Sequence, residues 1–160
     1  MRNSLLILVL TLCVVSCKKE VTEVASFNYD ELKPLLHAQD DKIYVVNFWA
    51  TWCAPCVKEL PYFEKINKEY KDKNVEVLLV SLDFPKKINS KLIPFINKKN
   101  IESKVILLDD KNEQFWIGDI SEKWSGALPA TLIYNKDKRE FFVEPLTYET
   151  LENTIQSFLK

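Results

Sequence analysis

Hydrophobic and polar residues follow two different periods along this chain of 160 residues. Nearly continuous runs of β-branched and other apolar residues occupy 42–50, 74–83 and 104–110, which is the pattern of strands buried on both faces of a sheet. Between these runs, at 54–70 and 89–100, apolar residues recur at the spacing of amphipathic helices. The sequence therefore predicts strands joined by helices, with the strand at 42–50 in the centre of the sheet.

The two ends of this region have their own patterns. Leucines at helical spacing in 28–39 predict a short helix, with Asn28 or Asp30 as its N-cap. Residues 130–146 predict two strands around a polar turn, and 147–160 predict a closing amphipathic helix.

A mixed sheet follows from this order of elements. Strands that alternate with helices are expected to be parallel, whereas the last two strands, joined by a short turn, are expected to be antiparallel. We therefore expect an α/β fold in which a central mixed sheet is flanked by helices. The segment 112–124 fits either a helix or a structured loop, and its periodicity does not choose between them.

The N-terminus has the pattern of an export signal. A positive charge at Arg2 precedes an apolar run at 5–15, and polar residues begin abruptly at Lys18. The run is shorter than the about 20 apolar residues that a transmembrane helix needs. We expect cleavage, with an uncleaved anchor as the alternative.

The end of the apolar run resembles a bacterial lipobox, because Val-Val-Ser at 14–16 precedes Cys17. The resemblance implies that Cys17 becomes the lipidated first residue of a mature chain, anchored to a bacterial membrane outside the cytoplasm. An ordinary secretory signal cleaved nearby is the alternative. The predicted organisation is a lipoprotein-type signal peptide at 1–16, a flexible tether at 17–25 and one domain at 26–160.

Charge and glycine content exclude several classes of partner. The formal net charge is −1 and the lysines are scattered among acidic residues, so nothing predicts nucleic acid as a partner. Only two glycines are present, Gly118 and Gly126, so the sequence lacks the glycines that a glycine-rich phosphate-binding loop needs. No cofactor is implied.

The cysteine count narrows the chemistry further. If Cys13 leaves with the signal peptide and Cys17 carries lipid, the folded domain keeps only Cys53 and Cys56, which can pair only with each other. A bridge that closes so short a segment contributes little loop-closure entropy, which disfavours a purely stabilising clip. A zinc site needs about four ligands, and the domain adds only His37 on a distant predicted helix. A redox-active disulfide is therefore favoured over a metal site.

The place of the two cysteines between a strand and a helix also favours thiol–disulfide exchange. Cys53 would lie at the helix N-terminus, where unpaired N–H groups and the helix dipole stabilise a thiolate and lower the pKa of the thiol. Cys56, one turn further along, would then attack a mixed disulfide, and Pro55 preorganises the turn between the two sulfurs.

Four sequence features resemble the thioredoxin superfamily and, within it, the TlpA/ResA-like membrane-anchored thiol-disulfide oxidoreductases. They are the run VVNFWATWCAPC at 45–56, Glu59, Pro61 and the run GALPAT at 126–131. The likeness covers 26–160. It implies a thioredoxin-like fold with an extra strand and helix inserted before a cis-proline.

The same resemblance assigns roles to individual residues. It makes Cys53 the exposed nucleophile and Cys56 the more buried, resolving thiol of a redox-active disulfide. The Leu128-Pro129 peptide bond is expected to be cis, so that Pro129 faces the disulfide. Substrate docking is expected at Trp52, Ala54, Pro55, Leu128 and Pro129. For Trp52, packing on the edge of the domain is the alternative.

Two polar residues are candidates for the proton that accompanies exchange. Glu59 lies three residues beyond Cys56 on the predicted helix, so the two side chains can share a face and the carboxylate can act in catalysis as a proton carrier. The alternative is a solvated surface glutamate. Asn47 occupies the strand position where thioredoxins carry a buried aspartate; a hydrogen-bonded buried amide without a chemical role is its alternative.

The predicted function is an extracytoplasmic, periplasmic and lipid-anchored thiol-disulfide oxidoreductase. The resemblance implies that it reduces disulfides in exported proteins, for example in cytochrome c maturation, and that a membrane thiol electron donor recharges it. We expect a monomer. A disulfide oxidant or isomerase is the first alternative, because sequence does not set a reduction potential. A non-catalytic binding module of thioredoxin fold is the alternative from another class, and a peroxidase is disfavoured because no separate peroxidatic motif is present.

Overall fold

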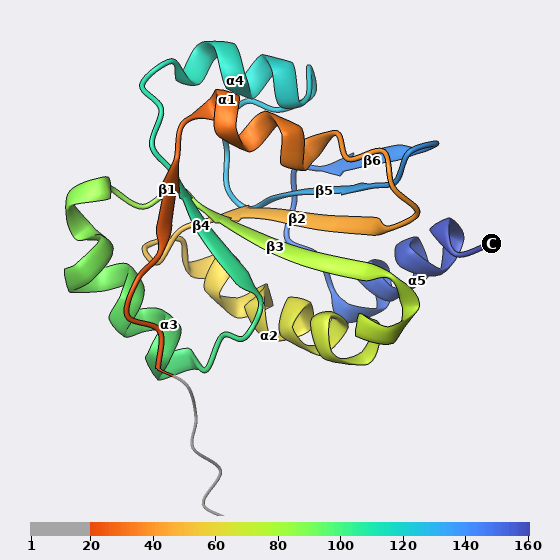
Figure 1. Ribbon diagram of the computed structural model, residues 1–160, viewed down its shortest axis with the longest axis horizontal. Helices are drawn as coiled ribbons and strands as arrows, with labels where there is room; N and C mark the ends of the chain where they lie inside the picture. The colour runs from red at the N-terminus through yellow and green to blue at the C-terminus, as the bar shows by residue number, and fades with distance from the viewer. Residues whose placement is uncertain (1–19) are drawn as a thin grey trace, which may run out of the picture.

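The computed structural model describes residues 20–160 and arranges them around a six-stranded sheet with the strand order β1-β4-β3-β2-β5-β6 (Figure 1). The strands are β1 (Ala25–Phe27), β2 (Ile43–Trp49), β3 (Val75–Ser81), β4 (Lys104–Leu108), β5 (Ala130–Tyr134) and β6 (Arg139–Phe142). The α-helices are α1 (Tyr29–Leu32), α2 (Ala54–Glu69), α3 (Ile93–Lys99), α4 (Glu113–Ile120) and α5 (Tyr148–Phe158). Shorter helical turns occupy Lys33–Leu36, Lys71–Lys73, Pro85–Lys87 and Ile88–Leu92.

The sheet is mixed, as the order of the elements predicted. Strands β1, β4, β3 and β2 are parallel, whereas β5 pairs antiparallel with β2 and β6 pairs antiparallel with β5. Parallel neighbours need a crossover connection, which α2 supplies between β2 and β3 and α3 supplies between β3 and β4. The predicted α/β architecture, with 42–50 as a central strand, is confirmed.

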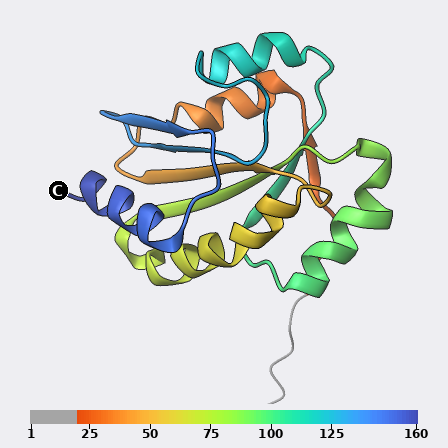
Figure 2. The same ribbon diagram turned by 180° about the vertical axis from the view of Figure 1, so that it is seen from behind.

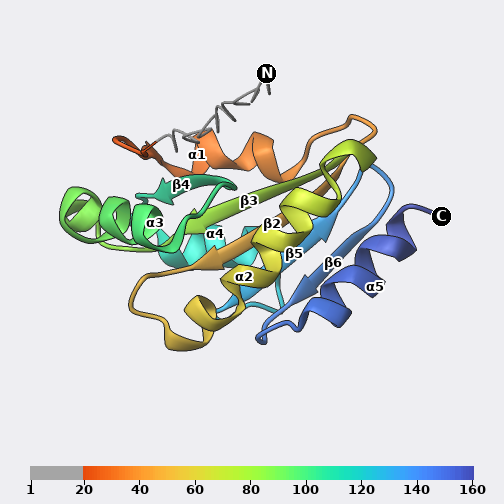
Figure 3. The ribbon, with the colours of Figure 1, turned by 90° about the horizontal axis from the view of Figure 1, so that it is seen from below.

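Helices cover both faces of the sheet. Helices α1 and α4 pack on one face and α2, α3 and α5 on the other (Figures 1 and 2). Seen from below, α2 lies over the central strands and runs roughly along them, with α5 beside it (Figure 3). Strand β2 supplies both layers, since Val45 and Trp49 join one buried cluster while Val46 and Phe48 join the other. Burial on both faces explains why its sequence is almost continuously apolar.

Local sequence explains how the first helix begins and ends. Asn28 caps α1 by accepting a hydrogen bond from the backbone N–H of Glu31, whose side chain in turn accepts from the Asn28 N–H. This reciprocal capping box satisfies donors that a helix start leaves unpaired. Pro34 has no N–H to continue the α-helical ladder, and the chain tightens into a 3₁₀ turn over Lys33–Leu36.

The segment before β1 is packed against the domain. The backbone N–H of Val21 donates to Asn97 Oδ1 at 2.9 Å, and Asn97 Nδ2 donates back to the Val21 carbonyl at 2.8 Å. Val24 is buried and Ala25 already belongs to β1. At least the part of the expected tether from Val21 onward is therefore packed against the domain. The expected signal peptide at 1–16 and Cys17 lie outside the described residues.

The segment that the sequence left open forms helix α4 and a structured turn after it. Trp124, in this turn, donates from its indole Nε1 to the Ala127 carbonyl at 2.8 Å. Gly126 has a φ of +86°, and a Cβ there would lie 2.8 Å from Ile117 Cδ1. The positive φ favours glycine at this position, whereas the close atom is the terminal methyl group of a flexible side chain and can shift. Within residues 20–160 no helix is long and apolar enough to cross a membrane.

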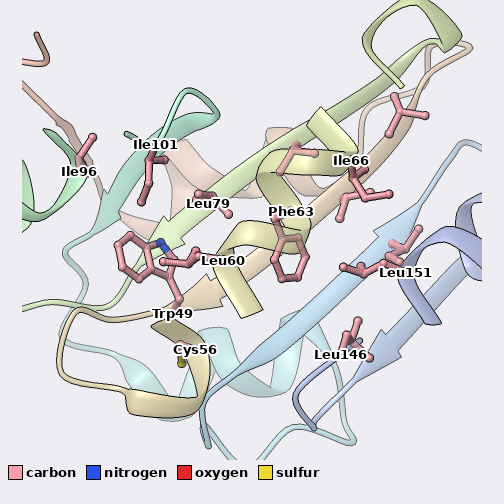
Figure 4. Close-up of a cluster of buried hydrophobic side chains, with 14 of the residues drawn as sticks. Trp49, Cys56, Leu60, Phe63, Ile66, Leu79, Ile96, Ile101, Leu146 and Leu151 are labelled. Carbon is pink, nitrogen blue, oxygen red and sulfur yellow. The ribbon is translucent and has the colours of Figure 1, made fainter. Parts of the chain in front are cut away.

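The buried cluster beneath α2 is expected to contribute strongly to stability, so truncating one of its large side chains is expected to be costly. Phe63 is fully buried there among Leu60, Ile66 and Leu151 (Figure 4). Because truncation removes apolar burial and leaves a cavity, Phe63→Ala will lower the free energy of unfolding by about 3–5 kcal/mol in urea denaturation. Lys68→Ala, an exposed position on the same helix, will change it by less than about 0.5 kcal/mol. Equal losses for both variants would contradict this packing.

Candidate active site

The site begins where strand β2 gives way to helix α2. The chain turns directly after β2, and the Cys53 N–H donates to the Ala50 carbonyl at 3.1 Å. Helix α2 starts at Ala54, with Pro55 in its first turn, where a missing N–H costs nothing. Cys53 is the N-cap: its sulfur accepts a hydrogen bond from the Cys56 backbone N–H at 3.3 Å. The sulfur thus lies where helix N–H groups favour negative charge.

Cys53 and Cys56 form a disulfide, with their Cα atoms 5.3 Å apart. Cys53 retains 6% of its surface and Cys56 none, so Cys53 is the more accessible of the two residues, although it is mostly buried and not exposed as the sequence predicted. Trp52, next to Cys53, is 60% exposed, and Ala54 and Pro55 are exposed as well. Exposed apolar residues therefore flank Cys53 on both sides along the chain.

A second segment comes to the same edge of the sheet from far along the sequence. The Leu128-Pro129 peptide bond is cis, and Pro129 is buried directly before β5. Because Ala130 pairs with Phe48, Pro129 lies beside the end of β2 that leads to Cys53. Leu128 is partly exposed and packs against both buried clusters. The sheet thus brings the two motifs of the sequence together.

Glu59 is buried, with only 2% of its surface exposed, so the alternative of a solvated surface glutamate is wrong. Its Oε1 accepts a hydrogen bond from Asn47 Nδ2 at 2.9 Å, and its Oε2 accepts from the Leu146 backbone N–H at 2.7 Å. Burial raises the pKa of Glu59 to about 7, and these two hydrogen bonds oppose that rise. The carboxyl group is therefore able to gain and lose a proton near neutral pH.

Asn47 links Glu59 to the strand that follows Pro129. It projects from β2 on the α2 side, and its Nδ2 also donates to Thr131 Oγ1 at 3.0 Å. Its Oδ1 is buried and has no hydrogen-bond partner in the part of the chain that the structure describes. The alternative of a fully hydrogen-bonded amide is thus met on one side only. The Asn47 amide therefore has partners for its nitrogen and none for its oxygen, and an unpaired buried acceptor costs free energy.

Sequence reasoning did not find the Leu146 contribution. Leu146 lies between β6 and α5 and acts through its main chain, 87 residues beyond Glu59. A backbone N–H leaves no residue-type signal, so no motif could have identified it.

His37, the one histidine, is exposed at the end of the 3₁₀ turn after α1. Within residues 20–160 no three His, Cys, Asp or Glu side chains gather as they would around a metal ion.

The strand order and the position of the disulfide define the class of protein: it has the thioredoxin fold, with a two-cysteine motif at the start of the helix that follows the central strand. Within this class, the chain belongs to the AhpC/TSA family, whose model matches residues 16–139.

Individual relatives agree with this assignment. The chain is 30% identical over 115 residues to a thiol-disulfide oxidoreductase ResA of Bacillus thuringiensis, which covers 72% of this chain and 60% of the relative. A ResA of Oceanobacillus iheyensis is 42% identical over 65 residues, which is 41% of this chain and 32% of that protein. The chain thus spans about three fifths of the length of the Bacillus relative.

Solved structures share the fold. StoA from Bacillus subtilis superimposes with a TM-score of 0.56 at 20% identity, over 72% of this chain and 83% of StoA. A thiol:disulfide interchange protein of the thioredoxin family from Chlorobium tepidum gives a TM-score of 0.64 at 16% identity, over 80% and 85% of the two chains. The thioredoxin-like fold predicted from the sequence motifs is confirmed, and the similarity to ResA proteins agrees with the resemblance that these motifs carry.

Proposed function

We propose that this protein is a thiol-disulfide oxidoreductase that reduces disulfides in exported proteins by cycling Cys53 and Cys56 between dithiol and disulfide. The observation that carries the proposal is the disulfide itself, whose more accessible sulfur occupies the N-cap of α2. A thiolate at a helix N-terminus is stabilised by N–H groups and by the helix dipole. Cys53 is accordingly the nucleophile and Cys56 the resolving thiol.

The reaction has two exchange steps. In the reduced protein, the Cys53 thiolate attacks one sulfur of the substrate disulfide, which forms a mixed disulfide and releases the other substrate sulfur as a thiolate. Cys56 then loses its proton and attacks the Cys53 sulfur, which releases the second substrate thiolate. Two electrons pass from the protein to the substrate, and the Cys53–Cys56 disulfide remains. A thiol donor returns the pair to the dithiol state.

Glu59 is the proposed acceptor for the Cys56 proton. The two residues are three positions apart on α2, so their side chains lie on the same face of the helix. A general base works best with a pKa near the working pH, and the buried Glu59 has a pKa of about 7. Its contacts with Asn47 and Leu146 hold the carboxylate in one place for the transfer.

The proposed docking surface surrounds Cys53, the more accessible of the two cysteines. It consists of Trp52, Ala54, Pro55, Leu128 and Pro129. Trp52 offers an exposed aromatic face beside Cys53, and the chain around Leu128 and Pro129 offers main-chain groups to an extended segment of substrate. An extended, at least partly unfolded polypeptide fits such a surface better than a compact one, because backbone pairing needs an accessible strand.

The proposed setting is a bacterial membrane surface outside the cytoplasm, with Cys17 as lipid anchor and 1–16 as signal peptide. The N-terminal sequence supports it. The same proposal includes action as a monomer, a membrane thiol electron donor and substrates of the kind matured in cytochrome c assembly. The direction of electron flow is tested by the reduction potential of the pair: about −270 mV favours a reductant and about −120 mV an oxidant.

Insulin reduction tests the activity. With dithiothreitol as donor, the wild-type protein will accelerate insulin reduction, and Cys53→Ser will lower the rate to that of the donor alone, because no nucleophile remains. Cys17→Ser, which also replaces a cysteine, will keep the wild-type rate. Wild-type protein without any turnover that depends on Cys53 would identify a non-catalytic binding module instead.

A further inference from the structure

Asp83 follows strand β3 and is a buried carboxylate that the chemistry proposed above does not use. Only 4% of its surface is exposed. Its Oδ2 accepts from the Thr51 backbone N–H at 2.9 Å and from Ser81 Oγ at 2.9 Å, while its Oδ1 accepts from Thr51 Oγ1 at 2.6 Å. Within residues 20–160 it forms no ion pair. The buried negative charge of Asp83 is thus compensated by hydrogen bonds from neutral groups.

Thr51, which supplies two of these donors, lies two residues before the nucleophile. The carboxyl ends of β2 and β3 are neighbours, since Trp49 pairs with Ser81 and the Leu82 N–H donates to the Trp49 carbonyl at 2.7 Å. The clamp between Asp83 and Thr51 therefore joins the turn after β2 to the turn after β3. The first of these turns ends at Cys53, whose sulfur must reach the N-cap position of α2.

We propose that Asp83 is a positioning residue for Cys53. By accepting both hydrogen bonds from Thr51, it fixes the turn that places the Cys53 sulfur against the Cys56 N–H, and it thereby sets the reactivity of the Cys53 thiol. The inference rests on the proposed function for its effect on turnover, but its effect on the thiol is independent of any substrate.

Charge and position predict opposite effects of Asp83. A nearby negative charge destabilises a thiolate and raises the pKa of a thiol, whereas a fixed N-cap geometry stabilises the thiolate. The two are separated by Asp83→Asn and Asp83→Ala. The asparagine keeps the clamp without the charge, because its Oδ1 accepts from the Thr51 N–H while its Nδ2 donates to the Thr51 hydroxyl. The alanine removes both.

The experiment measures how fast iodoacetamide alkylates Cys53 in the reduced protein at a pH below the pKa of the wild-type thiol, with the modified cysteine identified by peptide mass. At such a pH, Asp83→Ala is expected to react about threefold more slowly: a pKa rise of one unit cuts the thiolate fraction about tenfold, and the higher basicity returns about threefold in nucleophilicity. Asp83→Asn, which keeps the clamp and removes the negative charge, is expected to react at least as fast as wild type. Asp109→Ala, an exposed acid directly after β4, is the matched control and will react at the wild-type rate.

A hydroxyl deletion provides a second route to the same result. Thr51→Val removes one of the two Thr51 hydrogen bonds and keeps the charge, so its alkylation rate will fall between wild type and Asp83→Ala. The double variant will react no more slowly than Asp83→Ala alone, because the two side chains form one clamp.

Two results would overturn the assignment: a folded Asp83→Ala protein with the wild-type alkylation rate, or Asp83→Asn as slow as Asp83→Ala. Should Asp83→Ala fail to fold, an unchanged rate in Thr51→Val overturns it. Failure of the wild-type protein to reduce insulin would refute the proposed function and leave the alkylation result standing.

Discussion

Cys56→Ser will trap substrates on the protein as mixed disulfides through Cys53. Cys53 keeps its place at the N-terminus of α2 and can still attack a substrate disulfide, but the serine hydroxyl cannot attack the bond that forms. Turnover in insulin reduction will fall to the rate of the donor alone, as with Cys53→Ser, although Cys53 still reacts with iodoacetamide. The adducts will appear on non-reducing gels of membrane extracts and disappear on addition of dithiothreitol.

The control for trapping is the double variant Cys53→Ser/Cys56→Ser, which has the same fold and no nucleophile and will form no adducts. Cys17 is retained in both variants, so an adduct through that residue would appear in the control as well. If Cys56→Ser gives no adducts with extract or with purified oxidised insulin while Cys53 remains reactive, exchange through a mixed disulfide is wrong.

The second large effect concerns Glu59 and pH. Its pKa is about 7 in the folded protein against 4.5 for the free group, so between these values the folded chain binds more protons than the unfolded chain. Stability is therefore greatest below about pH 4.5 as far as this group is concerned, and it is lost as the pH rises through about 7. The difference amounts to about 3 kcal/mol.

Glu59→Gln will remove this loss, so that at pH 8 the variant unfolds at higher urea concentration than wild type, whereas at pH 5 the two are similar. The amide can be accommodated: its oxygen accepts from the Leu146 N–H, and its nitrogen donates to Asn47 Oδ1 once the Asn47 amide rotates, which moves Asn47 Nδ2 to the position where Oδ1 had no partner. A Glu59→Gln protein that keeps the wild-type pH dependence of stability would show that another group causes it.

The same variant separates stability from chemistry. A glutamine cannot accept the Cys56 proton, so Glu59→Gln will slow resolution of the mixed disulfide by about 10²-fold, and the rate will lose its inflection near pH 7. Asn47→Ala removes a hydrogen bond that lowers the pKa of Glu59, so its inflection will move to higher pH. Glu64 lies on the same helix but accepts a hydrogen bond from the Ser103 N–H. As the control, Glu64→Gln will keep the wild-type inflection. An unchanged inflection in Glu59→Gln would assign the proton to water or to another group.

The order and type of the main elements could be predicted from the sequence, because the burial of each element determines the local spacing of its apolar residues. Strand β2 reads as continuously apolar since it faces two clusters, and α2 shows helical spacing because only one side meets the sheet. The segment 112–124 stayed open, because its helix is short and Trp124 is held by a turn whose hydrogen bond with Ala127 has no periodic signal.

The disulfide between Cys53 and Cys56 and the cis bond before Pro129 could be predicted, because both belong to motifs with fixed residue types and spacing. Glu59 could be named, but its burial could not, because burial depends on the β6–α5 connection that places the Leu146 N–H over it. The role that we propose for Asp83 was missed for a similar reason. A polar residue after a buried strand is usual, and only the neighbouring position of Thr51 in space gives this one a role.

Cys56 has no exposed surface and belongs to the same buried cluster as Phe63. The reducible bond is therefore also a contact of the hydrophobic core. A thermodynamic cycle joins folding to reduction, so the potential of the pair, relative to that of the same cysteines in the unfolded chain, equals the difference in folding free energy between the oxidised and the reduced protein. Each 30 mV corresponds to about 1.4 kcal/mol. Urea titrations of the oxidised and of the reduced protein would therefore give the reduction potential of the pair relative to that of the same cysteines in the unfolded chain.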